Sequence, residues 1–517
     1  MHLITLTNTM ARYKPQDRNP LFLPVVLAEQ IIPGSFAFAL DYLVDHELDF
    51  TAMDATFKND EVGASAYDPR VMLKIVLLAY SQGLISSRAI ERACMHNVQF
   101  IAISGDYQPS HAHIAKFVSG LGEQIKLLFA QVLMTCDAQG LIGRNMFAID
   151  GVKLPSNASK ERSGTHDELL HRARRLEHAA DKIVRLHQSQ DNSTQEPALD
   201  AKRQTQVQAL RNEAARTREF VASHSRKLGV KRHELKTNVT DPESAKMATN
   251  KGVIQGYAAQ AAVDTAHQVI VAADVIGSGS EQGMLMPMIE HTAPYRAAHT
   301  LITADAGYHS EANVEQLLHQ AIPALVADNQ MRQRDERFAN QFRHKAKPDP
   351  LYDKQSTGKR QTIKRFKPVD FCFGNDNTCR CPAGKTLVST GAIYITVRGL
   401  RYQNFVGRPE DCSACDLRAQ CLKNLQSPRG RHVAKYESAV KDPHSASERM
   451  KRAIDSVAGR QLYSQRIGTV EPVFANLRHN KRLSRFNLRG TSKVNTQWHL
   501  YCMVHNIEKL ANSGWRQ

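Results

Sequence analysis

Two short apolar segments, far apart in the chain, each end on an aspartate. Residues 146–150 read MFAID, and residues 301–305 read LITAD. Apolar runs of this length are typical of buried strands, and ligands collect at the rim of an α/β sheet where such strands end. The sequence therefore predicts a sheet whose rim carries Asp150 and Asp305.

The segments around these two runs predict an α/β fold. Residues 256–264 and 267–277 are apolar runs separated by a turn, as in a hairpin. Helical patterns cover residues 280–293 and 310–320, and a last short strand covers residues 322–328. The order strand, helical arm, two strands, helix, strand, helix, strand predicts an α/β layer with helices packed on a sheet.

The chain before the first strand, residues 20–145, reads as mostly helical. Within residues 68–103, one helix is followed by a turn at Gly83 and Ser86 and by a second helix through Ile90. This pattern suits a helix-turn-helix that binds DNA, and it also suits an ordinary small helical bundle. The sequence leaves both interpretations open.

A long polar segment, residues 166–230, predicts a helical hairpin with a break at residues 188–200. Leu169, Leu176 and Ile183 follow heptad spacing on its first helix. A solvated arm and an arm that contacts DNA or a second chain remain equal alternatives. Earlier in the chain, His111 and His113 lie near a helix start and are interpreted as capping or surface residues.

The third candidate acid is Glu471. Thr469 can cap a helix, and Pro472 is tolerated in a first helical turn, so the sequence predicts Glu471 near a helix N-terminus. The positive end of the helix dipole would keep Glu471 ionised there. Four basic residues follow this acid, which leaves positive charge for a DNA backbone to neutralise. They are Arg478, Lys481, Arg482 and Arg485, the first of them seven residues on and therefore on about the same helix face.

Three carboxylates in one place would suit divalent cations. Mg²⁺ binds a few carboxylates together with water and phosphate oxygens, and two such ions about 4 Å apart can drive an in-line phosphoryl displacement. Without a cation, crowded acids repel and raise one another's pKa. The alternative for each acid alone is that it caps a turn or pairs with an arginine.

The overall charge favours a polyanionic partner. The chain has 68 Lys and Arg against 51 Asp and Glu, a formal net charge of +17. Each basic side chain placed at a phosphate releases condensed counterions, which favours nucleic acid. A basic surface that only keeps the protein soluble is the alternative, and proteins of ribosomes and anionic membranes share this charge balance.

The sequence predicts a cytoplasmic protein. No apolar run approaches the roughly 20 residues needed to span a bilayer. The first residues, MHLITLTNTMARYKP, lack the features of a signal peptide, and Met10 is a more natural start than Met1. In that compartment the nine cysteines are expected to be thiols or metal ligands rather than disulfides.

Several long segments resemble the DDE transposases of bacterial insertion sequences, and the resemblance covers nearly the whole chain. The N-terminal segment is YDPRVMLKIVLLAYSQGLISSRAIERAC, and FAIDGVKLPSNASKERSGT surrounds the first acid. TDPESAKMATNKGVIQGYAAQAAVDTAHQVIVAADV and ITADAGYHSEAN follow, and the last is YSQRIGTVEPVFANLRHNKRLSRFNLRGTSKVNTQWHLYCMVHNIEKL. The resemblance implies an RNase H-like mixed sheet with flanking helices, in which the first two acids follow the first and fourth strands.

The same resemblance implies the chemistry. Asp150, Asp305 and Glu471 would be the catalytic triad and would hold two Mg²⁺ or Mn²⁺ ions. The implied reaction is hydrolysis of one strand at the element end, followed by attack of the freed 3′-OH on target DNA. The implied partners are double-stranded DNA with terminal inverted repeats, target DNA and a second copy of the chain. Tyr463, Arg466 and Arg478 match the tyrosine and basic positions around the family's glutamate and are expected to position DNA. Lys481 and Arg482, which are basic neighbours, are expected to bind DNA with them.

Six cysteines between the second aspartate and the glutamate form two groups. They are Cys372, Cys379 and Cys381, then Cys412, Cys415 and Cys421. The CSAC spacing of the second group and the CPAG turn in the first are typical of zinc ligands, but six candidates exceed the four that one Zn²⁺ needs. Reduced buried thiols and a disulfide remain alternatives, and relatives carry similar cysteines in this place. Cys94, Cys136 and Cys502 are expected in the core.

The predicted organisation has three parts: a helical DNA-binding domain at 1–140, an RNase H-like catalytic domain at 141–330 and 455–517, and a basic Cys-rich insertion at 331–454. The helical arm at 166–230 would be inserted in the catalytic domain. Two rival functions remain: a DNA-binding protein derived from a transposase without catalysis, and a nuclease of the same fold without strand transfer.

Overall fold

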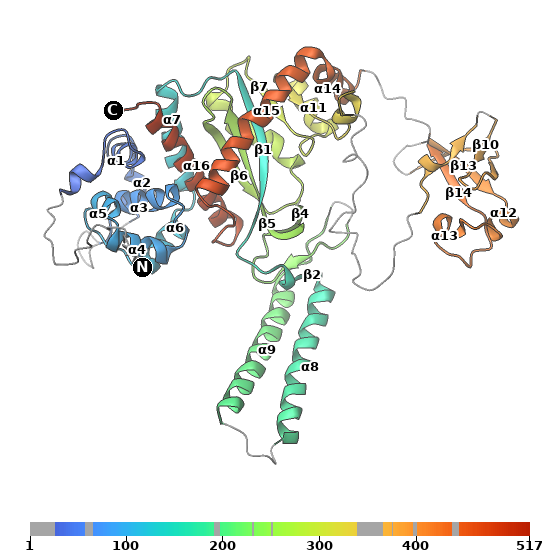
Figure 1. Cartoon of the computed structure of the whole chain (residues 1–517), viewed down its shortest axis with the longest axis horizontal. Helices are drawn as coiled ribbons and strands as arrows, with labels where there is room; N and C mark the ends of the chain where they lie inside the picture. Colours follow the sequence, from blue (N-terminus) through green and yellow to red (C-terminus); the bar gives the residue numbers. More distant parts are fainter. Residues whose placement is uncertain are drawn as a thin grey trace, which may run out of the picture.

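The computed structural model describes residues 26–56, 66–190, 197–229, 232–249, 252–338, 365–374, 376–396, 401–436 and 444–516 (Figure 1). The alternative start at Met10 lies outside the described residues, as does the beginning of the predicted insertion up to residue 364, apart from residues 331–338. In the described part of the chain, no helix is long and apolar enough to cross a membrane.

A mixed sheet forms the centre of the molecule. In the order β6-β5-β1-β7-β8, β5 runs antiparallel to both its neighbours, whereas β7 runs parallel to β1 and β8 runs parallel to β7. A further strand, β4, shares the outer edge of β5 with β6. The strands are β1 (Met146–Pro155), β4 (Ala245–Thr249), β5 (Gly252–Asp264), β6 (Ile270–Ile276), β7 (Leu301–Ala304) and β8 (Ala324–Val326).

Helices flank this sheet. In Figure 1, α15 (Val457–Ala475) crosses the sheet beside β1, and it contacts β1, β5 and β7. The short α10 (Leu285–His291) packs on β6 and β5, while α11 (Glu311–His319) packs on α14 (Ala446–Asp455). This arrangement confirms the predicted fold class, an RNase H-like mixed sheet with flanking helices and an N-terminal helical region.

The N-terminal helices share one continuous core with the sheet. The C-terminal helix α16 (Thr491–Asn512) makes this connection, since it packs against α7, α1 and α3 on one side and β6 on the other. Trp498 in α16 is fully buried and donates its indole N–H to the Gln260 carbonyl in β5, 2.9 Å away. The helices are α1 (Phe36–His46), α2 (Thr51–Asp54), α3 (Pro69–Ser81), α4 (Ser87–His96), α5 (Val98–Ser104), α6 (His111–Gly120) and α7 (Gln124–Ala138).

The predicted helix-turn-helix segment contains the expected turn. Gly83 has a φ of +71°, which favours glycine, and the Ser86 hydroxyl accepts a hydrogen bond from the Ala89 N–H at the start of α4. The predicted histidine roles are also found: the His113 ring bonds the capping Ser110, and the His111 ring bonds Glu91. Whether α3 and α4 contact DNA stays a prediction.

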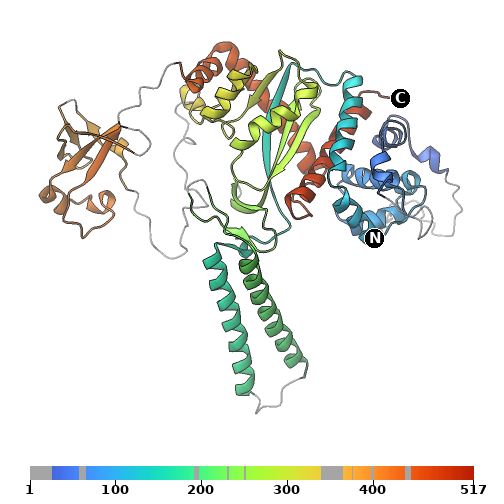
Figure 2. The same ribbon diagram turned by 180° about the vertical axis from the view of Figure 1, so that it is seen from behind.

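The predicted hairpin is present as α8 (His166–Gln190) and α9 (Pro197–Ser223), which project from the α/β body (Figures 1 and 2). A small ribbon of β2 (Ser163–Gly164) and β3 (Thr237–Asn238) closes its base. Ion pairs tie the two helices together: Arg218 lies 2.7 Å from Glu177, and Arg211 lies 3.3 Å from Asp181. Many basic side chains of the arm are therefore already paired within it.

The Cys-rich segment folds around a core of its own. Its antiparallel sheet has the order β12-β13-β11-β10-β9, with β14 also paired to β13. The strands are β9 (Cys372–Phe373), β10 (Thr378–Arg380), β11 (Thr386–Val388), β12 (Ile393–Ile395), β13 (Arg401–Gly407) and β14 (His432–Tyr436). Two short helices, α12 (Pro409–Ser413) and α13 (Arg418–Cys421), lie between β13 and β14.

Candidate active site

Sheet register places Asp150 and Asp305 side by side. The parallel pairing of β1 and β7 ends at the pair Ile149 and Ala304, and each aspartate is the next residue of its strand's chain. The prediction that β1 ends at Asp150 is wrong, because the antiparallel pairing with β5 carries this strand on to Pro155. Asp150 therefore lies at the point where β1 loses its β7 neighbour, and it remains at the rim of that pairing.

The two acids affect each other electrostatically. Burial raises the pKa of Asp150, the nearby guanidinium of Arg466 opposes this, and the charge of Asp305 raises the pKa further. The outcome is a pKa above the usual range for an aspartate. Arg466 Nη1 lies 3.0 Å from Asp150 Oδ2, so the arginine supplies positive charge beside the acids. Its Nε has no hydrogen-bond acceptor among the described residues.

A third carboxylate, Glu281, lies at the same place. A methyl group added at Gly307 would lie 3.0 Å from both Asp305 Oδ1 and Glu281 Oε2, and one added at Gly151 would lie 2.7 Å from Glu281 Oε1. Glu281 therefore occupies the space beside the two residues that neighbour the aspartates. Burial raises its pKa, Lys153 lowers it, and both Asp305 and Asp150 raise it, with a raised value as the net result.

The sequence interpretation missed Glu281. It assigned this residue to a helix at 280–293, whereas Glu281 precedes a single 3-10 turn at Gln282–Met284, and α10 begins only at Leu285. Glu281 lies five residues beyond the end of β6 at Ile276, whereas each aspartate directly follows the last β1–β7 pair. The pattern of an apolar run that ends on an acid therefore does not single out Glu281.

Buried polar groups lie beneath these acids. Gln260 in β5 is fully buried, and its Oε1 accepts a hydrogen bond from the Tyr308 hydroxyl. Its Nε2 forms no hydrogen bond of ordinary geometry with the described residues, yet it lies within 2.6 Å of the position that a Gly151 Cβ would occupy. This amide lies beside the Glu281 carboxylate, and their interaction lowers the pKa of that acid. Glycine at 151 is required here, because any larger residue would displace Gln260 or Glu281.

Glu471 lies elsewhere than predicted within its helix. α15 begins at Val457, capped by the Ser456 hydroxyl, so Glu471 is in its last turn rather than its first. Thr469 does not cap a helix: its hydroxyl donates to the Gln465 carbonyl. The prediction that the positive end of the helix dipole keeps Glu471 ionised is therefore wrong, since the C-terminal end of the dipole is negative.

Pro472 is tolerated inside α15 for a reason that depends on distant chain. Proline has no N–H to donate to the carbonyl four residues earlier, and that carbonyl belongs to Gly468. The Gln268 side chain donates to the Gly468 oxygen instead, at 3.2 Å. The helix therefore continues through Pro472 to Ala475 and then passes into a π-helical turn at Asn476–Asn480.

Glu471 is exposed, and the structure shows no bond between it and either aspartate among the described residues. It lies about 7.5 Å further along α15 than Arg466 and about 140° around the helix. Arg466 points to Asp150, so Glu471 projects from a different face.

The five predicted DNA-positioning residues differ in their surroundings. Tyr463 is half-buried, and the Arg466 guanidinium lies over its ring. Burial raises the pKa of the Tyr463 hydroxyl. Lys481 is buried and lies 2.7 Å from Glu508, so its charge is already neutralised. Arg478 and Arg482 are exposed, and the chain of Arg482 packs against Gly83 at the α3–α4 turn. Arg478 lies within the π-helical turn that follows α15, so its spacing of seven residues from Glu471 does not by itself place the two on one helix face.

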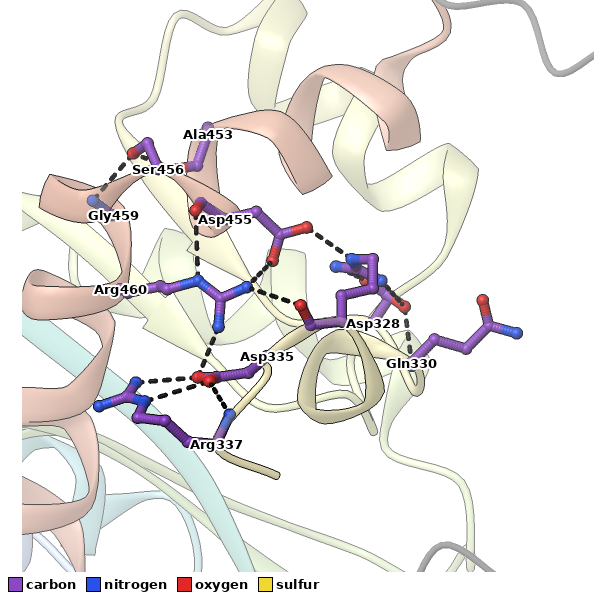
Figure 3. A network of polar contacts seen from close by, with 10 residues as sticks. Asp328, Gln330, Asp335, Arg337, Ala453, Asp455, Ser456, Gly459 and Arg460 are labelled. Carbon is purple, nitrogen blue, oxygen red and sulfur yellow. Dashed lines mark hydrogen bonds and ion pairs between the residues drawn. The ribbon is translucent and has the colours of Figure 1, made fainter. Parts of the chain in front are cut away.

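An ion-pair network fixes the start of α15 (Figure 3). Arg460 Nη1 lies 2.5 Å from Asp335 Oδ2, and its Nη2 lies 3.2 Å from Asp455 Oδ1. Arg334 joins Asp455 to Asp328, which follows β8. Arg337 holds the pKa of Asp335 well below its usual range. The helix that carries Arg466 is thus tied to the far strand of the sheet.

The acids do not stand at coordinating separations. In residues 26–516 less the gaps given above, no three Asp, Glu, His or Cys side chains have their donor atoms arranged to hold a metal ion. Asp150, Asp305 and Glu281 are nevertheless the type of oxygen donors that Mg²⁺ and Mn²⁺ prefer. The pKa values of Asp150 and Glu281 are raised, first by burial and then by neighbouring acids, and crowded acids behave in this way where no cation joins them.

A mixed sheet that carries acids at adjacent strand ends offers oxygen donors of the kind that divalent cations prefer. Two domain families match the chain: a transposase DDE domain over residues 380–511 and a transposase domain (DUF772) over residues 25–120. These two matches support a DDE transposase of the insertion-sequence type. The first match includes Glu471 and begins after both aspartates. No curated protein matches the chain.

Proposed function

We propose that this transposase binds the ends of a DNA element and catalyses metal-dependent strand cleavage followed by strand transfer. The observation that carries the proposal is the adjacency of Asp150 and Asp305 at the end of the β1–β7 pairing, where the charge of Asp305 contributes to the raised pKa of Asp150. Two carboxylates held together by a rigid sheet suit a shared pair of divalent ions. The transposase families at both ends of the chain support the same reaction.

Two Mg²⁺ or Mn²⁺ ions, when bound, would supply the Lewis acid that activates the attacking oxygen and stabilises the leaving one. Asp150 and Asp305 hold these ions from the sheet. Arg466 neutralises Asp150 in their absence. The Nε of Arg466 has no acceptor among the described residues, so this guanidinium would bind a DNA phosphate beside Asp150.

Two glutamates compete for the third position. Glu471 is our first choice, because it lies within the residues that match the transposase DDE domain. To join the aspartates, it requires α15 to rotate or shift when DNA binds. Glu281 needs no such movement, since its carboxylate already lies beside Asp305. We assign Glu281 the role of an accessory acid that helps to retain the ions.

The net charge of +17 supports a double-stranded DNA partner. We infer that Arg478 and Arg482, which are exposed, bind the DNA backbone together with Arg466 and Tyr463. Lys481, which is paired with Glu508, holds in place the segment of chain between Arg478 and Arg482. Two element ends must meet in one complex, so we propose a homodimer that acts on DNA in the cytoplasm of a bacterium. The domain limits at 140, 330 and 454 remain part of this proposal.

The test uses the full-length protein and duplexes that carry the inverted repeats flanking its gene. Wild type should nick the repeat end only with Mg²⁺ or Mn²⁺ and should join a pre-cleaved 3′-OH end to target DNA. Asp150→Ala should lose both reactions and still bind the duplex. Binding without any cleavage by wild type would favour a non-catalytic DNA-binding protein. Cleavage without joining would favour a nuclease.

A further inference from the structure

Four of the six clustered cysteines line one small cavity. Cys381, Cys412, Cys415 and Cys421 surround a space of about 30 Å³. A cavity of this size can hold about one water-sized particle. The four residues come from separate parts of the unit, so their convergence results from folding and not from spacing alone. The sequence did not identify which cysteines would meet.

Local backbone geometry presents each thiol to this space. Cys381 follows β10 and starts a tight turn in which the Gly384 N–H donates to the Cys381 carbonyl at 2.8 Å, with Gly384 at a φ of +78°. Cys412 lies in α12 and Cys421 ends α13, with Cys415 between the two helices. The Arg431 N–H points at Cys412 Sγ, 3.4 Å away, a contact that stabilises a thiolate.

The other two cysteines of the unit have different positions. Cys379 is 1% exposed and belongs to the small core beside Leu387 and Phe405. Cys372 is exposed and pairs across the sheet with Arg380, on the face opposite Cys379. Neither residue lines the cavity. The cavity lining therefore distinguishes four candidate ligands from Cys379 and Cys372.

The unit has too small a core to account for its own fold. In the described part of the unit, five buried hydrophobic side chains form the core, with the partly buried Phe366 and Phe373 packed against them. The five are Phe371, Cys379, Leu387, Phe405 and Val433. A core of this size is below what a small independent fold requires, and natural folds in this range add disulfides or a structural metal. The cysteines are free thiols in the structure. A metal ion is the remaining cross-link.

Charged residues around the cavity fit a negatively charged centre. Four thiolates around a divalent ion carry a net charge of −2. Four basic residues line the cavity, with Asp411 as their acidic neighbour: Lys385, Arg408, Arg418 and Arg431. Arg418 also donates to the Cys412 carbonyl at 2.6 Å, which fixes the loop that carries this ligand. The surroundings thus supply the countercharge that such a centre needs.

We propose that Cys381, Cys412, Cys415 and Cys421 bind one structural Zn²⁺ ion that holds the Cys-rich unit together. Four sulfur donors and no open position are the arrangement of a structural zinc site. The thiols of the described unit are not yet at coordinating separations, so rotation of their side chains completes the tetrahedron. Metal binding would also deprotonate Cys421, whose pKa burial now raises.

The experiment measures bound metal in the full-length protein, expressed with zinc and purified without chelators. We expect one zinc per chain by mass spectrometry. The double variant Cys412→Ser/Cys415→Ser should lose it, and Cys372→Ser, the matched control outside the cavity, should retain it. Asp150→Ala/Asp305→Ala should also retain it, which distinguishes this ion from those of the proposed active site.

A second measurement needs no variant to fold. A thiol reagent is added to native wild-type protein before and after a strong chelator. The chelator should expose five further thiols, namely the four ligands and Cys379, which is buried in the small core that unfolds as zinc is released. Four outcomes would overturn the proposal: wild type without zinc, zinc retained by the double variant, zinc lost with the two aspartates, or iron with visible absorption in place of zinc.

Discussion

The rim of the central sheet and the cavity of the Cys-rich unit are both suited to metal ions, but they relate to folding in opposite ways. The acids lie on a sheet whose core continues through α16 into the N-terminal helices, so the surrounding fold is stable without an ion. The thiols lie on a unit with five buried hydrophobic side chains. A large core tolerates a repulsive acid cluster, whereas a small core depends on its ligands.

The largest expected effect is the response of the two regions to chelation. Removal of zinc should unfold the Cys-rich unit, because structural zinc contributes roughly 10–16 kcal/mol of binding free energy in small domains. The α/β domain should stay folded in the same chelator. Hydrogen exchange of the full chain measures both regions at once. If the amides of β13 were equally protected from exchange with and without chelator, the Cys-rich unit would not depend on zinc, and the two regions would not differ in this respect.

The next effect concerns chemistry alone. Asp150→Ala should lower the rate of strand cleavage by at least about a thousandfold, since loss of metal positioning costs several kcal/mol in the transition state. The melting temperature should change little, because the side chain is at the rim and not in the core. Cleavage assays and thermal melts of one preparation check this. A variant that cleaves normally would remove Asp150 from the proposed site.

A comparison of the two glutamates separates the candidates for the third ligand. Glu471→Gln should reduce cleavage by roughly a hundredfold at any metal concentration, an effect near 3 kcal/mol. Glu281→Gln should reduce it by about tenfold and recover as Mn²⁺ is raised, because it weakens retention of the ions. The measurement is the cleavage rate across a Mn²⁺ titration. If the two variants exchange these behaviours, Glu281 is the third ligand and α15 need not move.

Sequence reasoning located the features that depend on local pattern. The strands ending near Asp150 and Asp305 are short apolar runs, and their adjacency follows from the order of strands in the RNase H-like sheet. The predicted start of the helix that carries Glu471 is wrong, because Thr469 and Pro472 together resemble the residues that begin a helix. Gln268, about two hundred residues earlier, satisfies the carbonyl that Pro472 leaves free. No local rule includes such a partner.

The same limit applies to Glu281 and to the cysteines. Glu281 reaches the aspartates only because β6 and β1 flank the same strand, β5. Cys379 and Cys381 are two residues apart, yet the first lies in the core and the second lines the cavity. That division depends on where β10 ends and the turn at Cys381 begins. Spacing gave the candidates, and tertiary structure selects among them.

A smaller expected effect is a change in the pH dependence of cleavage, which tests whether Arg466 acts on Asp150 before metal binds. Arg466→Met removes the cation that lowers the pKa of Asp150, so this pKa should rise further. The ionised form that binds metal is lost as pH falls through the pKa, and the acid limb of the pH–rate profile should move to higher pH. Lys126→Met, a surface cation on α7, serves as the control. An unchanged acid limb would show that Arg466 does not act on Asp150.

The smallest expected effect is on the free energy of unfolding, and it tests whether the acids at the sheet rim destabilise the fold. Asp305→Asn keeps the acceptor for the Gly307 N–H, 2.8 Å away, and removes a charge beside Asp150. In metal-free buffer near pH 7 it should raise the free energy of unfolding by ~1 kcal/mol, a typical gain when functional strain is relieved. The sign follows from the raised pKa of Asp150 in the folded chain. The stability that protonated Asp150 contributes is fully present below its unfolded-state pKa and is lost as pH rises through its folded-state pKa. The difference in stability between variant and wild type should therefore grow from acid to neutral pH.

Added Mg²⁺ should make wild type the more stable protein, because only wild type retains both aspartates to bind the ion. Denaturant unfolding at two pH values, with and without Mg²⁺, measures these differences. A variant less stable than wild type under metal-free conditions would mean that the acids of the sheet rim, unlike the thiols of the small unit, are already compensated by the fold.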